Sequence, residues 1–514
     1  MDTADLIFTG GSIITVDPET EGATAVAVCD GRILAVGGRE VLSLRGPGTD
    51  VIELDDRCLL PGFVEPHTHP TRDQILFSES VVDIRPTACA TAAQVRSVVD
   101  EAVRAARPGR ALLFHGLDPE LQPGFPEPTR EWLDELAPDR PIVIRQNAGR
   151  IAWANSAALR LAGLSEDTAD PFGGHFERDR YGMLTGKAYE ESAIAAVTDR
   201  IVADHPDPAI GLLAREHEHF AARGVTLCGD MGFTDEIRVR TARLYQHGLA
   251  KVRTRAYETA SPTMGTICPR DNGDDMFRQI GIKLLRAPDT ARHTADRLGE
   301  LVRAYHPHGW QLACRAQDGD EATLVLDAYE QALRAYPRSD HRLRLEHCGA
   351  MTPEQFRRAN QLGVTCSLFM DHLYYWGDTT PGGDADAAAW EPESHWVRAR
   401  SAIEADVRIS FHNDCPVTPE APLHNMACAI TRVSRRGRVL GPDEGVNLEQ
   451  AIRAQTLDAA YQLFADDITG SITPGKYADL VVLDVDPYTV TPDELPDIGV
   501  RTTYLAGVAT HRRS

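Results

Sequence analysis

The sequence lacks the features that mark a membrane or secreted protein. No stretch reaches the roughly 18 consecutive apolar residues that a membrane-spanning helix needs. The first residues, Met1-Asp2-Thr3-Ala4-Asp5, have neither the basic region nor the apolar region of a secretion signal. Ten cysteines are scattered along 514 residues, and no two of them form a Cys-x-x-Cys pair. We therefore expect reduced, mostly buried thiols in a cytoplasmic protein; a metal site on a lone pair of them is the less common alternative.

Positive charge is scarce relative to negative charge. Lys plus Arg total 53 and Asp plus Glu total 76, which gives a formal net charge of −23. A surface of that sign repels the phosphates of nucleic acids and the head groups of anionic lipids, so we expect neither nucleic acid nor a membrane as a partner. With 42% hydrophobic and 25% charged residues, the composition is that of a folded globular protein. It excludes a mainly disordered, collagen-like or coiled-coil chain.

Both ends of the chain have the sequence pattern of small β-structures. In the first sixty residues, apolar runs such as Ala25-Val26-Ala27-Val28 alternate with Asp-Gly and Gly-Gly turns. Near the other end, the run Ala478-Asp479-Leu480-Val481-Val482-Leu483 is typical of a buried strand. We therefore predict one composite β-sandwich built from residues 1–58 and 468–514.

The middle of the chain, residues 59–467, alternates short apolar runs with helical patterns, which is typical of parallel βα units. Amphipathic helices are predicted from about Arg292 to Tyr305 and from Glu321 to Tyr336. The predicted fold class is α/β, with a TIM-like (β/α)8 barrel. Because the first two strands are separated by about 160 residues, we predict a large insert at about 71–215, with a strand at 141–144. The eight candidate barrel strands are 62–64, 225–228, 252–257, 282–285, 311–314, 344–346, 364–367 and 407–411.

Two histidines follow the first predicted barrel strand. In the stretch Pro61-Gly62-Phe63-Val64-Glu65-Pro66-His67-Thr68-His69-Pro70, an apolar strand ends at His67 and His69. Residues two apart on a strand point to the same side, and active sites of such barrels lie at the carboxyl ends of the strands. Two neutral imidazoles there can bind one zinc, iron or nickel ion. Taken alone, the pattern also fits two exposed loop histidines.

Several motifs in a fixed order carry a resemblance to a known family. The chain resembles the amidohydrolase superfamily over nearly its whole length, specifically the amidohydrolase-3 branch of YtcJ-like proteins and N-substituted formamide deformylases. Agreement of several dispersed motifs in order is more specific than any one of them. The motifs are Leu60-Pro61-Gly62-Phe63 with His67-Thr68-His69, Ala152-Trp153-Ala154-Asn155-Ser156-Ala157-Ala158-Leu159, Leu345-Glu346-His347, Tyr375-Trp376-Gly377-Asp378, Asn413-Asp414-Cys415-Pro416-Val417 and Gly470-Ser471-Ile472-Thr473-Pro474-Gly475-Lys476-Tyr477-Ala478-Asp479-Leu480.

The resemblance implies roles for five residues. His67 and His69 would hold a first metal, which Asp414 would also bind while acting as the general base. Lys283, carboxylated by CO2, would bridge to a second metal that His347 would help to hold. On the residues alone, plainer readings stay open: Asp414 as a turn or N-cap aspartate, Lys283 as an outward-facing lysine, and His347 as a structural histidine.

Two positions depart from the family pattern. The fifth predicted strand is followed by Arg315, where the family usually has a histidine, and a protonated arginine cannot bind a metal. In the insert, Arg150 stands where related chains often have a histidine. Both changes replace a titratable imidazole with a permanent cation.

Three interpretations of these changes stay open. In the first, which we favour, the site holds one metal, and Arg315 supplies the charge of a missing second metal, facing a Lys283 carbamate. In the second, a second metal persists on His347, Lys283 and an unforeseen ligand. In the third, Arg315 or Arg150 clamps a carboxylate or phosphate of the substrate.

Other side chains are candidates for the substrate pocket. We assign substrate binding to Arg150, Glu190, His372 and Trp376, and we consider His395 as a further residue of the barrel mouth. Trp376, with Tyr374 and Tyr375, could equally pack a lid, whereas His372 and the charged residues of the insert could lie on the surface.

The leading hypothesis is a metal-dependent amidohydrolase that cuts a non-peptide C–N bond (an amide, formamide or cyclic amide) by metal-activated water. The cofactor expected is a divalent metal, zinc in the first instance, with one ion per site and two as the alternative. The partner expected is a small-molecule substrate, and a homodimer is the commonest assembly of such enzymes. Alternatives are a lyase, decarboxylase, isomerase or ring-forming enzyme on the same scaffold, and an inert binding protein.

Overall fold

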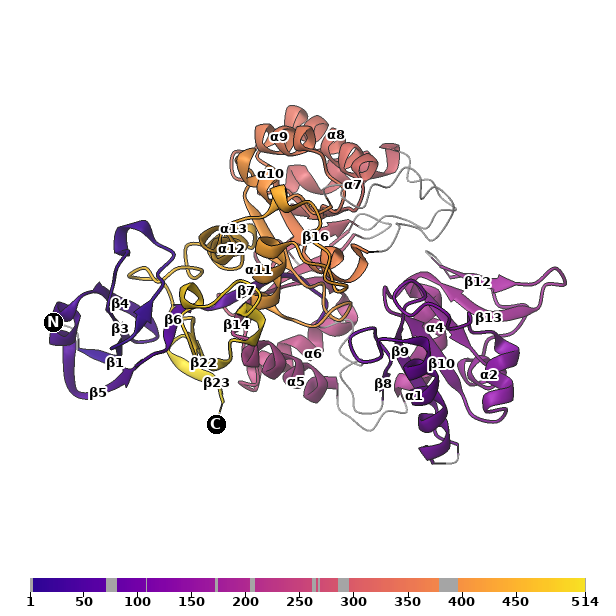
Figure 1. The fold of residues 1–514 in the computed structure, drawn as a ribbon. Helices are drawn as coiled ribbons and strands as arrows, with labels where there is room; N and C mark the ends of the chain where they lie inside the picture. Colours follow the sequence, from indigo (N-terminus) through magenta and orange to yellow (C-terminus); the bar gives the residue numbers. More distant parts are fainter. Residues whose placement is uncertain are drawn as a thin grey trace.

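The computed structural model describes residues 3–70, 81–107, 109–171, 174–203, 209–260, 265–266, 269–284, 295–378 and 396–513. Figure 1 shows three regions: a central barrel, a β-structure on one side that contains the N-terminus, and an insert on the other side. The C-terminal strands lie between the N-terminal strands and the barrel (Figure 1).

An eight-stranded parallel sheet forms the centre of the molecule. Its order is β20-β19-β18-β17-β16-β15-β14-β7, and β20 lies against β7, so the sheet nearly closes into a barrel. Every strand overlaps a predicted one, which confirms the TIM-like fold class. The strands are β7 (Phe63–Thr68), β14 (Val225–Phe233), β15 (Arg253–Thr259), β16 (Phe277–Leu284), β17 (Gln311–Ala316), β18 (Arg344–His347), β19 (Thr365–Phe369) and β20 (Ile409–His412).

Amphipathic helices follow the barrel strands. In α8 (Gly319–Ala335), the Asp318 side chain accepts a hydrogen bond from the N–H of Glu321 and caps the first turn, so the helix begins two residues before the predicted start. In α7 (Ala295–Tyr305), the predicted first turn, 292–294, lies outside the described residues. The other helices around the barrel are α5 (Ala209–Ala222), α6 (Asp235–Gln246), α9 (Pro353–Leu362), α10 (Ala399–Glu404), α11 (Pro422–Thr431), α12 (Leu448–Ala454) and α13 (Leu457–Gln462).

Strands from both ends of the chain build two further sheets, of order β4-β3-β1-β5 and β2-β6-β21-β22-β23. The second sheet joins the two ends, because β21 pairs antiparallel with β6. Val481 of β21 packs in the same apolar core as Phe63 of the barrel. The domain boundaries at 58 and 468 stay a prediction. The strands are β1 (Ala4–Thr9), β2 (Ser12–Ile13), β3 (Ala25–Cys29), β4 (Arg32–Gly37), β5 (Arg45–Glu53), β6 (Cys58–Pro61), β21 (Leu480–Leu483), β22 (Val500–Leu505) and β23 (Val508–Arg512).

The insert folds around a six-stranded sheet of its own, of order β12-β13-β11-β10-β9-β8. Successive residues of β9, Leu113 and Phe114, belong to different apolar clusters, so helices cover both faces of this sheet. The predicted strand at 141–144 is present as β10. The elements are β8 (Val81–Asp83), α1 (Ala92–Ala105), β9 (Leu112–Leu117), α2 (Arg130–Leu136), β10 (Ile142–Gln146), β11 (Ile151–Ala154), α3 (Ser156–Ala162), β12 (His175–Arg178), β13 (Leu184–Tyr189) and α4 (Glu190–Ala203).

Two sequence expectations concern the whole chain. Within the described ranges, no helix combines the length and the apolar character needed to cross a bilayer. Nine cysteines fall in those ranges, all with free thiols and all but Cys29 buried. Cys268 lies outside the described residues.

His217 on α5 is a buried histidine that couples folding to pH. Its Nδ1 accepts a hydrogen bond from the backbone N–H of Lys251 at 3.3 Å, and its ring contacts Phe220 and Tyr245. Burial lowers the pKa of His217 from 6.5 to about 3. Between these two values the unfolded chain binds one proton more than the folded chain, so stability falls as the pH drops.

We expect the His217→Gln variant to be less sensitive to acid than the wild type. The glutamine amide can accept the same hydrogen bond but takes up no proton in the unfolded chain. Between pH 7 and 5 the variant should therefore lose about 2 kcal/mol less of its unfolding free energy. Chemical denaturation at both pH values measures this difference, with exposed His308→Gln as the control. Equal losses in His217→Gln and the wild type would contradict the assignment.

Candidate active site

Two histidines and an aspartate meet at the carboxyl ends of the first and eighth barrel strands. His67 lies near the end of β7, His69 follows that strand, and Asp414 follows β20. Asp414 Oδ1 lies 3.3 Å from His67 Nε2 and 3.1 Å from His69 Nε2. All three residues are buried, and their potential ligand atoms lie within 4.8 Å of one another. Closure of the barrel thus brings together groups that are far apart in the sequence.

The backbone fixes these side chains in place. The N–H of His69 and the hydroxyl of Thr68 both donate to the carbonyl of Cys415, at 3.0 and 3.1 Å. Asp414 and His347 adopt left-handed conformations, with φ of 53° and 72°. Such a conformation costs a non-glycine residue about 1–3 kcal/mol and is concentrated at functional sites.

Glu346 orients the His67 ring. Its Oε2 lies 2.6 Å from His67 Nδ1, so Nδ1 donates its proton to Glu346, and Nε2 is left with a lone pair on the side of Asp414. Arg344 forms a fully buried ion pair with Glu346, at 2.7 Å. A carboxylate behind a ligating imidazole both fixes the tautomer and increases its basicity.

Lys283 on β16 lies against His67, with 3.2 Å between Nζ and His67 Nε2. Burial, opposed by the charges of Glu346 and Asp414, lowers the pKa of Lys283 to about 8. The predicted lysine therefore lies at the barrel mouth. Its amine loses its proton at a lower pH than the amine of an exposed lysine does. Carboxylation of this amine stays a prediction.

Two further imidazoles, those of His347 and His412, lie beside His67. The ring centroid of His347 lies 5.0 Å from that of His67, and the His412 ring stacks on His67 at 4.5 Å. Burial, together with the neighbouring charges that include Lys283, lowers the pKa of all three rings well below 6.5, so they are neutral, as metal binding requires. Both ring nitrogens of His412 are buried without a hydrogen-bond partner among the residues described.

The sequence interpretation did not single out His412. A signal was available, because His412 lies two residues before Asp414 on one barrel strand, and residues two apart point to the same side. A single histidine in an apolar strand is more often structural, however, and only the closed barrel shows that it reaches His67.

Arg315 reaches the same region from β17. Its register partner on β18 is Glu346. Burial is the main cause of the lowered pKa of both His347 and His372, and the positive charge of Arg315 adds to it in each case. The permanent cation of Arg315 therefore lies near the position of the family's fifth-strand histidine. The catalytic role of Arg315 stays a prediction.

His372 and Trp376 lie in one turn of π-helix, His372–Trp376, after β19. Their ring centroids are 5.5 Å apart, and His372 lies 6.2 Å from His347, so the two predicted pocket residues do border the site. The Trp376 side chain hydrogen-bonds Asp118 of the insert, which therefore forms part of the wall of the mouth. His395, the further candidate, lies outside the described residues.

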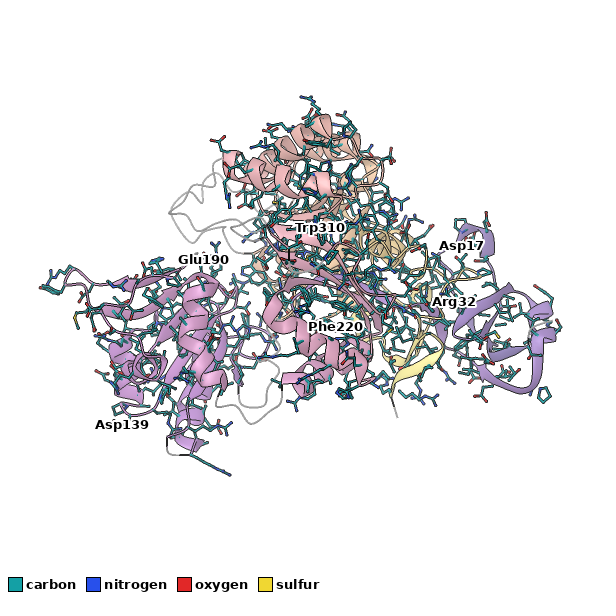
Figure 2. The ribbon with its side chains drawn as sticks, turned by 180° about the vertical axis from the view of Figure 1, so that it is seen from behind. Asp17, Arg32, Asp139, Glu190, Phe220 and Trp310 are labelled. Atoms are coloured by element: carbon teal, nitrogen blue, oxygen red, sulfur yellow. The ribbon has the colours of Figure 1, made fainter. Side chains whose placement is uncertain are left out.

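Arg150 and Glu190 lie in the insert and pair with each other. The Arg150 guanidinium donates to Glu190 Oε1 at 2.6 Å, and the two side chains are 42% and 24% exposed. Figure 2 shows Glu190 within the insert. Because each charge already has a partner, substrate binding by these two residues would require exchange of an existing ion pair, and it stays a prediction.

The donor set fits a divalent cation. Asp414 Oδ1 and His69 Nδ1 are buried and lack hydrogen-bond partners in the described part of the chain. Such a carboxylate oxygen is costly to bury unless a cation faces it. One carboxylate and two imidazoles are suitable ligands for a catalytic zinc ion with an open position.

A parallel barrel that presents histidines and an aspartate around one point at its carboxyl-terminal face has the architecture of a hydrolytic barrel enzyme. A family model described as "Amidohydrolase family" matches residues 50–511, and the chain belongs to this family. The resemblance seen in the motifs is thereby confirmed, and the protein is a hydrolase.

Individual relatives match over the full length. N-substituted formamide deformylase of Arthrobacter pascens is 28% identical, over 99% of both chains. YtcJ of Bacillus subtilis (strain 168) is 24% identical, also over 99% of both chains. An uncharacterized metal-dependent hydrolase from Pyrococcus horikoshii OT3 superposes with a TM-score of 0.71 at 19% identity, covering 95% of this chain and 99% of that chain, which shows a shared fold.

Proposed function

We propose that the protein hydrolyses a non-peptide C–N bond of a small molecule (an amide, formamide or cyclic amide) with a divalent metal held by His67, His69 and Asp414. The observation that carries this proposal is the buried Asp414 Oδ1, which faces Nε2 of both histidines. The full-length similarity to an N-substituted formamide deformylase makes N-formyl amines the first substrate class to test.

The side chains divide the chemistry among them. When bound, the divalent ion supplies the charge that polarises a carbonyl and acidifies water, and zinc is the ion we propose. Glu346 keeps His67 in the tautomer whose Nε2 can act as a ligand. Because Asp414 Oδ1 faces the histidines, Oδ2 is left to accept the proton of the attacking water. Asp414 then passes that proton to the leaving nitrogen.

We further propose that the mouth holds a single metal. Arg315 stands where a second metal's histidine would be, and its charge replaces that of the second ion. The amine of Lys283, which burial makes easier to deprotonate, can react with CO2 to give a carbamate that faces this cation. Anomalous scattering at the zinc edge should show one peak among His67, His69 and Asp414. A second peak between Lys283 and His347 would refute the single-metal site.

Isotopic water tests the reaction class. Turnover of an N-formyl amine in ¹⁸O-labelled water should place the label in the carboxylate product, because only hydrolysis must incorporate the oxygen of water. Chelation should abolish turnover, and added zinc should restore it. Product that forms without the label would point instead to a lyase, isomerase or decarboxylase on this scaffold, the alternative that Arg315 suggests.

The cytoplasmic location and the homodimer stay proposals. Free thiols at all nine described cysteines are consistent with a reducing compartment. Mass measurement in solution at several protein concentrations tests the dimer.

A further inference from the structure

A second group of metal-binding residue types shares no residue with the barrel-mouth site. Asp371 follows β19, and His424 and Cys428 lie on α11. Residues four apart on a helix lie on the same side, so the sequence His-x-x-x-Cys presents an imidazole and a thiol together. The three side chains converge, and their potential ligand atoms lie within 4.8 Å of one another.

Two of the three separations match those around a tetrahedral zinc ion. His424 Nε2 lies 3.2 Å from Asp371 Oδ1 and 3.3 Å from Cys428 Sγ. Zinc bond lengths with tetrahedral angles give about 3.3 Å between nitrogen and oxygen ligands and about 3.5 Å between nitrogen and sulfur ligands. Little movement of these side chains is needed to place one ion among them.

The two carboxylate oxygens of Asp371 have different partners. Its Oδ2 accepts hydrogen bonds from the Asn413 amide, at 2.8 Å, and from the Thr418 hydroxyl. Its Oδ1 is buried on a side chain that is 1% exposed, and it faces the His424 ring, with 3.2 Å to Nε2. One Nε2 atom of His424 faces both Oδ1 and Sγ, and a single proton on it can serve only one of them. A cation can contact all three atoms.

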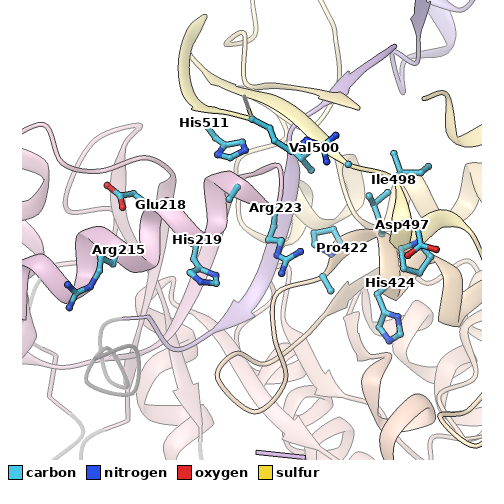
Figure 3. Close-up of a pocket in the computed structure, with 16 residues that line it drawn as sticks. Arg215, Glu218, His219, Arg223, Pro422, His424, Asp497, Ile498, Val500 and His511 are labelled. Carbon is cyan, nitrogen blue, oxygen red and sulfur yellow. The ribbon is translucent and has the colours of Figure 1, made fainter. Parts of the chain in front are cut away.

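The group lies beside a cavity. His424 is one of the residues that line a cavity of about 870 Å³ between α5, the start of α11 and the C-terminal strands. Figure 3 shows His424 at this cavity, beyond Pro422 and below Asp497. Asp371 and Cys428 are buried behind it, at 1% and 3% exposure. His424 therefore lies between the cavity and the two buried side chains.

We propose that Asp371, His424 and Cys428 bind a second divalent ion of the zinc type, with water in the fourth position. Thiolate and imidazole ligands together favour zinc over magnesium or calcium. The ion would join α11 to the segment after β19. It would also hold the carboxylate whose other oxygen fixes Asn413, the neighbour of Asp414. Its role is therefore to position the catalytic loop rather than to act on substrate.

Cobalt substitution tests this proposal with a signal that the barrel mouth cannot give. A cobalt–thiolate bond absorbs strongly in the near ultraviolet, whereas His67, His69 and Asp414 include no sulfur. The full-length protein, freed of metal and loaded with cobalt(II), should show this band. Cys428→Ser should lose the band and one metal equivalent per chain. Cys366→Ser, a buried cysteine of β19, is the matched control and should keep both.

Two further measurements separate this site from its competitors. Cys415 lies with Glu216 and Glu420 in another buried group, so loss of the band in Cys415→Ser with retention in Cys428→Ser would overturn the proposal. The absence of any thiolate band in folded, cobalt-loaded wild type would also overturn it, without reliance on a variant. His69→Gln should lose the mouth ion but keep the band, so failure of the proposed function and failure of this site are distinguishable.

Discussion

Asp414→Asn should lower kcat by about 10²–10⁴-fold while the protein keeps its metal. Asparagine has the shape of aspartate and can still offer an oxygen toward His67 and His69, but it cannot take up the proton of the attacking water. The φ of 53° at this position is also well tolerated by asparagine, so the fold should survive. Steady-state kinetics and metal analysis on the same preparation measure both parts of the expectation.

The His69→Gln variant is the control for Asp414→Asn. That variant removes a ligand rather than a base, so activity and mouth metal should disappear together. Added zinc in excess should restore part of its activity, whereas it should not help Asp414→Asn. Wild-type turnover in the Asp414→Asn variant would refute the role of Asp414 as general base. Loss of the metal from that variant would show instead that Asp414 acts as a metal ligand.

The parts of the site that the sequence predicts are those where local pattern and strand order suffice. His67 and His69 follow an apolar strand directly, and Asp414 follows another, so the carboxyl-terminal rule for barrels places all three at one face. Lys283 and His347 are predicted from the family resemblance, which matches them to the ends of two further strands. The structure brings these five residues together.

Other features depend on the register between segments, which the sequence does not reveal. Arg150 pairs with Glu190 because β11 and β13 are neighbours in the insert sheet, and nothing in the intervening forty or so residues predicts that pairing. Glu346 orients His67 only because β18 and β7 face each other across the barrel interior. The convergence of Asp371 with α11 depends on how a helix packs over a strand end.

Asp479→Asn should be among the most destabilising single substitutions outside the active site. Asp479, which precedes β21, receives two hydrogen bonds from the Arg253 guanidinium of β15, at 2.7 and 3.0 Å. Both side chains are buried, at 0% and 2% exposure. The pair therefore joins the barrel to the C-terminal strands. Removing the carboxylate charge leaves the guanidinium of Arg253 buried without its ion-pair partner, which costs about 3–5 kcal/mol.

An exposed pair provides the matched control. Asp484, which directly follows β21, pairs with Arg513 at the surface, where the side chains are 28% and 50% exposed. Asp484→Asn should change the unfolding free energy by less than about 1 kcal/mol, because water screens this pair. Urea denaturation followed by circular dichroism compares the two variants.

The double variant Arg253→Met with Asp479→Leu separates two explanations of the loss. If an uncompensated buried charge is the cause, removing both charges should recover most of the stability, because apolar side chains of similar volume replace buried ion pairs with little cost. If the hydrogen bond from the Ala506 N–H to Asp479 Oδ1 is the main contribution, the double variant should be less stable than Asp479→Asn, because the asparagine oxygen can still accept this bond and leucine cannot. The buried charge is the larger effect, since one neutral hydrogen bond contributes only about 1 kcal/mol.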